Sequence, residues 1–260
     1  MIKTIKQWLF RIKEYPLLLE RFNDSESELN LVMEELKKYK QLEEPYGSYA
    51  EYWNTKWKQS VITYSAPKKL KVTEYLAYRQ IPEITQLAQQ LIREHHLIST
   101  LPDKVPLEVL KWLEERFNSL GFRYLPETKE YWDQPEEVME KKEADCDGYG
   151  ILEYFLIREI FKQLNCWEIV KHRLKCVDGH VHHPQLFYPY GGRHFYLIWL
   201  NGEKQWMTVE TTFYRELAIA NYGKKAQKDN PIYGTINYTF NEQFSWAHNS
   251  LVVERNYEKR

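Results

Sequence analysis

The stretch Asp145-Cys146-Asp147-Gly148-Tyr149 decides the fold, because it leads directly into an apolar segment that ends at Leu164. Within that segment the apolar residues recur with a helical period, at positions 151, 152, 155, 156, 160 and 164. The pattern predicts a long buried helix with Cys146 at its N-terminus. Unpaired backbone N–H groups and the helix dipole favour an anion there, so we expect them to lower the pKa of the Cys146 thiol.

A hairpin further along the chain supplies partners for this cysteine. The run from Phe195 to Leu200 is apolar on both faces, which predicts a central strand that begins near His194. Asn201-Gly202 is a strong hairpin signal, and residues 203–210 are expected to return as the partner strand. A thiol nucleophile needs a histidine within hydrogen-bonding reach and a polar group that orients its ring. His194 and Glu210 are the candidates.

The length of the hairpin loop decides whether Glu210 can reach His194. With a two-residue turn the two side chains would point to opposite faces, because successive strand residues alternate. We therefore predict a three-residue loop, or a bulge, somewhere between residues 194 and 210. Either would bring both side chains to one face of the sheet.

These residues resemble the transglutaminase-like superfamily, most closely its bacterial transglutaminase-like cysteine peptidase branch. The family pattern is an aromatic stretch with Pro and Glu, a Gly-Asp-Cys box, a Gly-Gly-x-His strand start, and an Asp before Thr. The resemblance covers roughly residues 100 to 250, and the matching residues are Trp132, Pro135, Glu136, Asp145, Cys146, Asp147, Tyr149, Gly191, Gly192, His194, Glu210, Thr211 and Thr212. Ala144, Gly148 and Glu210 depart from the pattern, where Gly, an acidic residue and Asp are usual.

The resemblance implies an α+β fold with a papain-like or transglutaminase-like core, in which the catalytic helix packs on an antiparallel sheet. It implies acyl transfer through a Cys146 thioester, with His194 as base and Glu210 as the group that orients it. A protein or peptide is the expected substrate, hydrolysis by a cysteine peptidase or amidase is expected over cross-linking, and no cofactor is required. The implied oxyanion hole combines the Cys146 backbone N–H with Trp132 or Tyr131, for which core packing is the alternative role.

A second constellation has the residue types of a metal site. Cys176, Asp178, His180 and His182 alternate, with His183 adjacent, so an extended chain would present four ligands for a zinc-like ion on one face. Gly179 and Pro184 interrupt any regular strand, so we expect a solvated loop and no metal. The preceding residues 166–177 are rich in Val, Ile and aromatic neighbours, which predicts a strand.

The chain is expected to divide into an N-terminal helical extension with an aromatic linker, residues 1–60, and a catalytic domain, residues 66–260. The extension begins with a basic amphipathic helix that ends near Pro16, followed by a second helix behind the capping residues Ser25 and Glu28. We expect these helices to contact a protein partner and not a membrane. Two further helices are predicted at 82–95 and 106–120, the second closed by Gly121.

Composition excludes several classes of protein. Lys plus Arg (36) and Asp plus Glu (37) nearly cancel, so no nucleic-acid partner is expected. Three cysteines are too few for a disulfide framework, and neither a membrane-spanning run nor a signal peptide is seen, which predicts a cytoplasmic protein. An alternative function stays open: a structural or assembly protein of a larger particle that uses the same fold, active or not.

Overall fold

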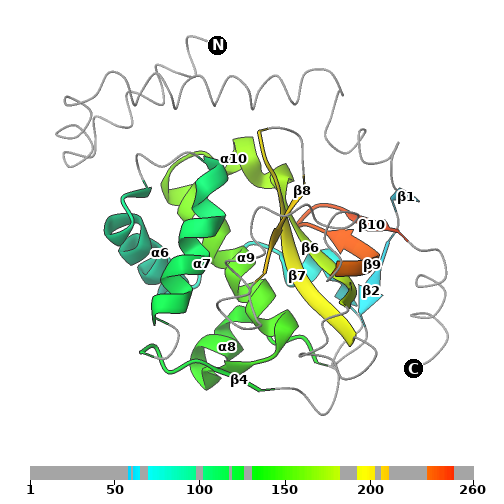
Figure 1. Cartoon of the computed structure of the whole chain (residues 1–260), viewed down its shortest axis with the longest axis horizontal. Helices are drawn as coiled ribbons and strands as arrows, with labels where there is room; N and C mark the ends of the chain where they lie inside the picture. The colour runs from blue at the N-terminus through cyan, green and yellow to red at the C-terminus, as the bar shows by residue number, and fades with distance from the viewer. Residues whose placement is uncertain are drawn as a thin grey trace, which may run out of the picture.

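The computed structural model combines a group of helices with an antiparallel sheet, which confirms the α+β class (Figure 1). It describes residues 58–59, 61–64, 70–97, 102–116, 119–125, 131–181, 192–202, 206–210 and 233–248. The two helices predicted near the N-terminus lie outside the described residues.

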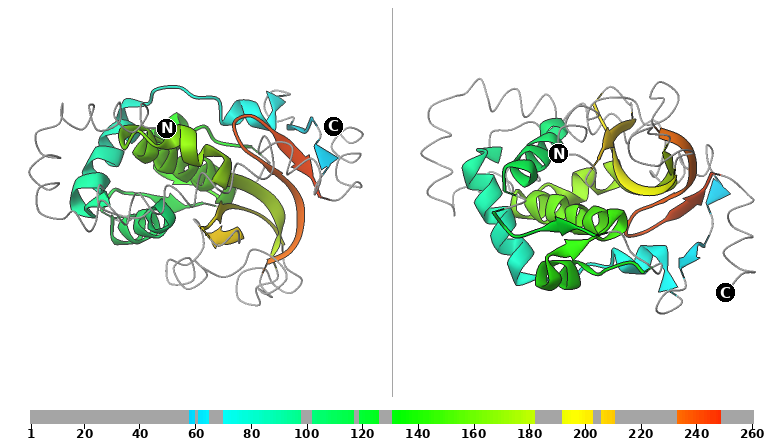
Figure 2. Two further views of the ribbon diagram at one scale, coloured as in Figure 1. Left: turned by 90° about the horizontal axis from the view of Figure 1, so that it is seen from above. Right: turned by 60° about the horizontal axis from the view of Figure 1, so that its bottom comes forward.

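The main sheet brings together strands from distant parts of the sequence. Every neighbouring pair is antiparallel. The order across the sheet is β1 (Lys58–Gln59), β10 (Ser245–Ala247), β9 (Tyr233–Phe240), β6 (Leu174–Val181), β7 (Gly192–Leu200) and β8 (Trp206–Val209). The long strands curve strongly around one another (Figure 2).

Two short strand pairs lie outside this sheet. One is the antiparallel pair β2 (Thr63–Tyr64) and β3 (Leu70–Lys71), and the other is the parallel pair β4 (Arg123–Tyr124) and β5 (Glu143–Ala144). The helical elements are α5 (Val72–Tyr75), α6 (Pro82–Glu94), η3 (Pro102–Lys104), α7 (Val105–Arg116), α8 (Pro135–Lys141), α9 (Cys146–Gln163), α10 (Trp167–Val170) and η4 (Lys171–Arg173).

Helix α9 is the centre of the molecule, and it lies between α6 and α7 on one side and the sheet on the other (Figure 1). Its residues from Gly148 to Arg158 are all buried, as are Ile160 and Phe161. A helix that is apolar nearly all round is stable only when other elements enclose it. The sequence pattern of residues 151–164 therefore fixes α9 as the core helix, as predicted.

The two faces of the sheet bury different residues. The face toward α9 contributes Cys176, Phe195, Leu197, Trp199, Val209, Tyr238 and Phe240 to the main core. The opposite face carries a smaller cluster of Val177, Val181, Tyr196, Ile198 and Ile236. Because β6 and β7 bury both faces, their apolar character is continuous and not alternating.

The predicted elements before the cysteine agree with the structure closely. Helix α6 begins at Pro82 as predicted and ends at Glu94, one residue before the predicted end. Helix α7 begins at Val105, one residue before the predicted start, and ends at Arg116, short of the predicted residue 120. Gly121 has a φ of +79°, a left-handed conformation that glycine adopts without strain. It ends the turn that leads into β4.

The strand predicted for residues 166–177 is wrong up to residue 173. Trp167 and Val170 begin and end the short helix α10, and both are buried. The Trp167 ring contacts that of Tyr154 on α9 edge to face, at 6.1 Å between centroids. Packing on α9 thus overrides the strand preference of these residue types. The strand begins only at Leu174 and extends to Val181, so residues 178–181 are not the solvated loop we expected.

The sheet begins inside the segment predicted as the N-terminal extension. Lys58 and Gln59 pair with Ala247 and Trp246 of β10, and Ile62 belongs to the main core. The domain division stays a prediction, but a truncation that spares the sheet has to end before Lys58.

Candidate active site

The N-terminus of α9 presents Cys146, as predicted. Asp145 caps the helix, because its Oδ1 accepts a hydrogen bond from the backbone N–H of Asp147 at 3.2 Å. Strand β5 leads directly into this cap. The thiol is half-buried at the edge of the core.

Two glycines allow α9 to approach its neighbours closely. A Cβ on Gly148 would lie 2.7 Å from the Cβ of Ala144, and a Cβ on Gly150 would lie 2.4 Å from Cδ1 of Phe195. The first contact explains two departures from the family pattern together, since the methyl group of Ala144 fills the space beside Gly148. The second brings α9 against the residue that follows His194.

We predict that Gly150→Ala destabilises the protein by about 2 kcal/mol. Overpacking at such a short separation costs about 3 kcal/mol, while the better helix propensity of Ala returns about 1 kcal/mol. Urea denaturation measures the difference. In the double variant with Phe195→Leu the penalty should shrink, because the ring that the added methyl group would meet is gone. Wild-type stability of the single variant would contradict the contact.

His194 on β7 and Glu210, directly after β8, form a buried pair. The His194 Nε2 atom lies 2.9 Å from both carboxylate oxygens, and the two residues are only 2% and 4% exposed. A carboxylate only accepts hydrogen bonds, so Nε2 carries the proton and Nδ1 is the basic nitrogen of the neutral ring. The Tyr196 ring stacks on the imidazole at 5.9 Å. The pair therefore holds a fixed tautomer and orientation.

The pairing of β7 with β8 puts His194 and Glu210 on one face, as predicted. Leu200 pairs with Trp206 and Leu197 with Val209, so even residues face even residues and odd face odd. The predicted three-residue loop is wrong, because five residues, 201–205, separate the last pair. Asp103 gives the reason: its carboxylate accepts from the Gly202 N–H and from the Trp199 indole, both at 2.8 Å. These hydrogen bonds fix Gly202 against Asp103, so residues 201 and 202 do not form the tight turn between β7 and β8.

Cys146 lies at the end of β7 that carries His194. The backbone N–H of Phe195 donates a hydrogen bond to the Cys146 sulfur, and the charge of Glu210 also acts on this thiol. The structure thus gathers Cys146, His194 and Glu210 around one segment of β7. A helix-borne thiol and an oriented imidazole are the parts that nucleophilic catalysis requires.

The expected lowering of the Cys146 pKa is wrong. Burial raises the pKa well above its usual value, and the carboxylates of Asp147 and Asp145 raise it further, against the Phe195 N–H, which lowers it. The acidic residues that complement the helix dipole thus offset its effect on the thiol. The thiol is neutral at rest, so forming the thiolate requires a base.

Two charged or polar neighbours of this site escaped the sequence analysis. Glu153 is 1% exposed, and neither of its carboxylate oxygens has a hydrogen-bond partner in the described part of the chain. Burial and the charge of Glu210 raise its pKa well above the usual value. The available signal was a single acidic residue in the apolar stretch 151–157, two helical turns after Cys146. The second neighbour is Tyr124 on β4, whose hydroxyl is subject to the charges of Cys146 and Glu210.

The two predicted oxyanion donors have other contacts. Trp132 is 3% exposed, and its ring stacks on Phe240 at 5.6 Å and meets the rings of Phe195 and Tyr75 edge to face. The Tyr131 hydroxyl donates to Oε1 of Glu137 at 2.7 Å. Core packing is thus evident for Trp132, and the oxyanion role of either residue stays a prediction.

The alternating Cys and His residues do not assemble a metal site within the described residues. Cys176 and Asp178 are buried whereas His180 is exposed, and Asp178 binds Arg193 and Asn237 instead. His182 and His183 lie outside the described residues. The one described group with ligand atoms within 4.8 Å of one another is Asp145, Cys146 and Asp147, and Asp145 is engaged there as the helix cap.

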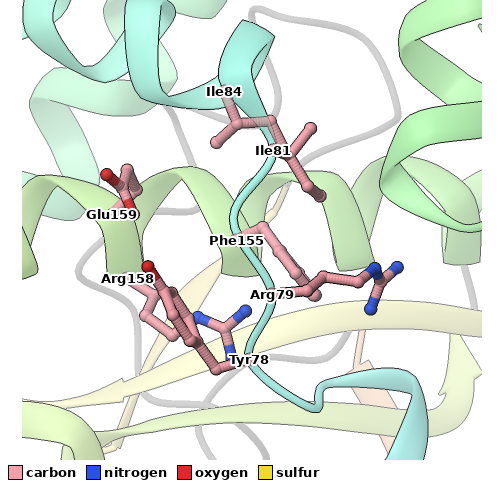
Figure 3. Close-up of a pocket in the computed structure, with 7 residues that line it drawn as sticks. All are labelled: Tyr78, Arg79, Ile81, Ile84, Phe155, Arg158 and Glu159. Carbon is pink, nitrogen blue, oxygen red and sulfur yellow. The ribbon is translucent and has the colours of Figure 1, made fainter.

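A small pocket beside the middle of α9 is separate from Cys146. It is lined by Tyr78, Arg79, Ile81, Ile84, Phe155, Arg158 and Glu159 (Figure 3). Buried Arg158 donates there to the carbonyl of Leu76 at 2.5 Å and to Glu242 at 3.0 Å, so its charge is paired. Phe155 lies about 13 Å along the helix from Cys146. The pocket therefore takes no part in the candidate site.

The candidate site thus consists of a buried His–Glu pair on an antiparallel sheet and a thiol at the N-terminus of the core helix. No protein-family model and no curated protein sequence matches the chain. Among solved structures it is similar to LapG of Legionella pneumophila in an EGTA-treated form, with 18% identity over 65% of this chain and 85% of that one and a TM-score of 0.37. None of the described helices is both long and apolar enough to cross a membrane.

Proposed function

We propose that this chain is a transglutaminase-like cysteine hydrolase, which cleaves an amide or peptide bond through a thioester on Cys146. The observation that carries the proposal is the buried His194–Glu210 pair, with Nε2 at 2.9 Å from both carboxylate oxygens. The Cys146 sulfur accepts the N–H of the very next residue, Phe195. A buried imidazole held in one tautomer can act as the general base for a thiol that lies at the same end of its strand.

The proposed reaction has two steps. The Cys146 sulfur attacks the acyl carbon while its proton moves to Nδ1 of His194. The C–N bond then breaks and that proton leaves with the amine. In the second step, water attacks the thioester and gives a proton to His194, which returns it to the sulfur as the acid departs. Because the resting thiol is neutral, proton transfer accompanies the attack and a preformed ion pair is not required.

The acyl-enzyme itself is the test of this function. Wild-type protein is mixed with 4-nitrophenyl acetate, quenched with acid at short times and mapped by mass spectrometry. We expect a burst of 4-nitrophenolate and one acetyl group on Cys146. Cys166 and Cys176 are internal controls, since burial raises the pKa of Cys166 to about 12 and Cys176 is fully buried. An unmodified Cys146 would contradict the proposal and favour the assembly role.

The fate of the acetyl group separates hydrolysis from cross-linking. We expect acetate as the product even when methylamine is present, because water is the proposed acceptor. N-methylacetamide as the main product would identify an acyltransferase that prefers amines.

A further inference from the structure

Strand β4 lies directly along the chain that enters the catalytic helix. The N–H of Arg123 donates to the carbonyl of Lys142 at 2.8 Å, and the N–H of Leu125 donates to that of Ala144 at 3.0 Å. In this parallel pair Tyr124 is in register with Ala144. Residues in register place their side chains on the same face, so the Tyr124 ring lies beside the Ala144 methyl group.

That face is turned toward the first turn of α9. The Cβ of Ala144 lies 2.7 Å from where a Cβ on Gly148 would be, which leaves no room for anything between them. Tyr124 is half-buried and packs against the edge of the main core. Its side chain therefore lies along the turn that begins at Cys146.

The charges that act on the Tyr124 hydroxyl are those of the candidate site. After burial, the groups that raise its pKa are Cys146, Asp145, Asp147 and Glu210, in that order. All four favour the protonated phenol, which is the form that donates a hydrogen bond. A neutral donor beside the nucleophile is what an oxyanion hole requires.

We propose that the Tyr124 hydroxyl donates a hydrogen bond to the oxyanion that forms when Cys146 attacks the acyl carbonyl. This inference rests on the proposed function, and it makes Tyr124 a further catalytic residue. The Tyr131 hydroxyl is already given to Glu137, and the Trp132 ring is enclosed by Tyr75, Phe195 and Phe240. Tyr124 supplies the side-chain donor, and the backbone N–H of Cys146 supplies the second.

Two reagents separate an oxyanion donor from a residue that only activates the thiol. Acylation by 4-nitrophenyl acetate passes through an oxyanion, whereas alkylation by iodoacetamide at the same sulfur does not. In Tyr124→Phe the acylation rate should fall about 10²–10³-fold while the alkylation rate of Cys146 stays that of wild type. An unchanged alkylation rate also reports that the site is still folded.

Tyr149→Phe is the matched control. Its hydroxyl donates to the carbonyl of Arg123 at 2.6 Å, on the same strand but bound to backbone, so its loss should leave acylation nearly unchanged. Incorporation of 3-fluorotyrosine at position 124 keeps both ring and donor, so acylation should be retained there. Loss of acylation with the fluorinated residue, or an equal fall of both rates in Tyr124→Phe, would overturn the inference.

The acetylation experiments distinguish a failure of the Tyr124 inference from a failure of the proposed function on which it rests. A wild-type protein whose Cys146 is not acetylated removes the proposed function. A wild-type protein that is acetylated on Cys146, together with a Tyr124→Phe variant that reacts at the same rate, removes Tyr124 alone.

Discussion

Cys146→Ala should abolish the burst of 4-nitrophenolate and all acetylation while leaving the fold intact. Cys146 is the proposed nucleophile, and a methyl group fits where a half-buried thiol lay. Burst amplitude measures the first effect, and thermal unfolding followed by circular dichroism measures the second. Cys166→Ala is the matched control and should acylate like wild type.

Substitution of His194 should lower the acylation rate more than substitution of Glu210. His194→Ala removes the base and should lower acylation by about 10²–10⁴-fold. Glu210→Ala should cost less, because an orienting group contributes less than the base that it holds. A Cys146→Ala variant with unchanged turnover, or a Glu210 variant more impaired than the His194 variant, would contradict these roles.

Glu153→Gln should raise the stability of the protein strongly at neutral and alkaline pH. The folded-state pKa of Glu153 is raised by burial, whereas in the unfolded chain a glutamate titrates near about 4.3. Below that pH both states are protonated and the native glutamate costs nothing. Above it only the unfolded chain ionises, so the wild type loses about 1.4 kcal/mol per pH unit until the folded-state pKa is passed.

The measurement is urea denaturation of wild type and Glu153→Gln between pH 4 and 8. We expect the two curves to meet near the low end and to diverge as the pH rises, with the variant more stable. Glu140→Gln, at an exposed position on α8, controls for the loss of one acidic group. A constant difference between wild type and Glu153→Gln across this range would show that Glu153 is ionised in the folded protein.

The features of the site that depend on local sequence pattern could be predicted from the sequence. The helical period of residues 151–164 predicted α9 and the place of Cys146, and strand alternation predicted that His194 and Glu210 share a face. The parts that failed depend on contacts between distant residues. Asp103 opens the β7–β8 connection from nearly a hundred residues away, and α9 draws Trp167 into a helix.

The electrostatics of the site and the burial of its side chains also could not be predicted from the sequence. A helix N-terminus alone lowers a thiol pKa, but the balance at Cys146 depends on how much water the folded chain excludes and on the placement of Asp145 and Asp147. Tyr124 gave no sequence signal at all. Its relation to Cys146 comes only from the register of β4 on β5.

The connection between β7 and β8 has a consequence for how this protein can change in length. Five residues separate Leu200 from Trp206, and the register of β8 on β7 is set by the paired residues of the two strands. Residues added after Gly202 would lengthen this connection and leave those pairs unchanged, so Glu210 would keep its place beside His194. Insertions there, whether evolved or engineered to carry a new binding segment, can therefore have an odd or an even number of residues.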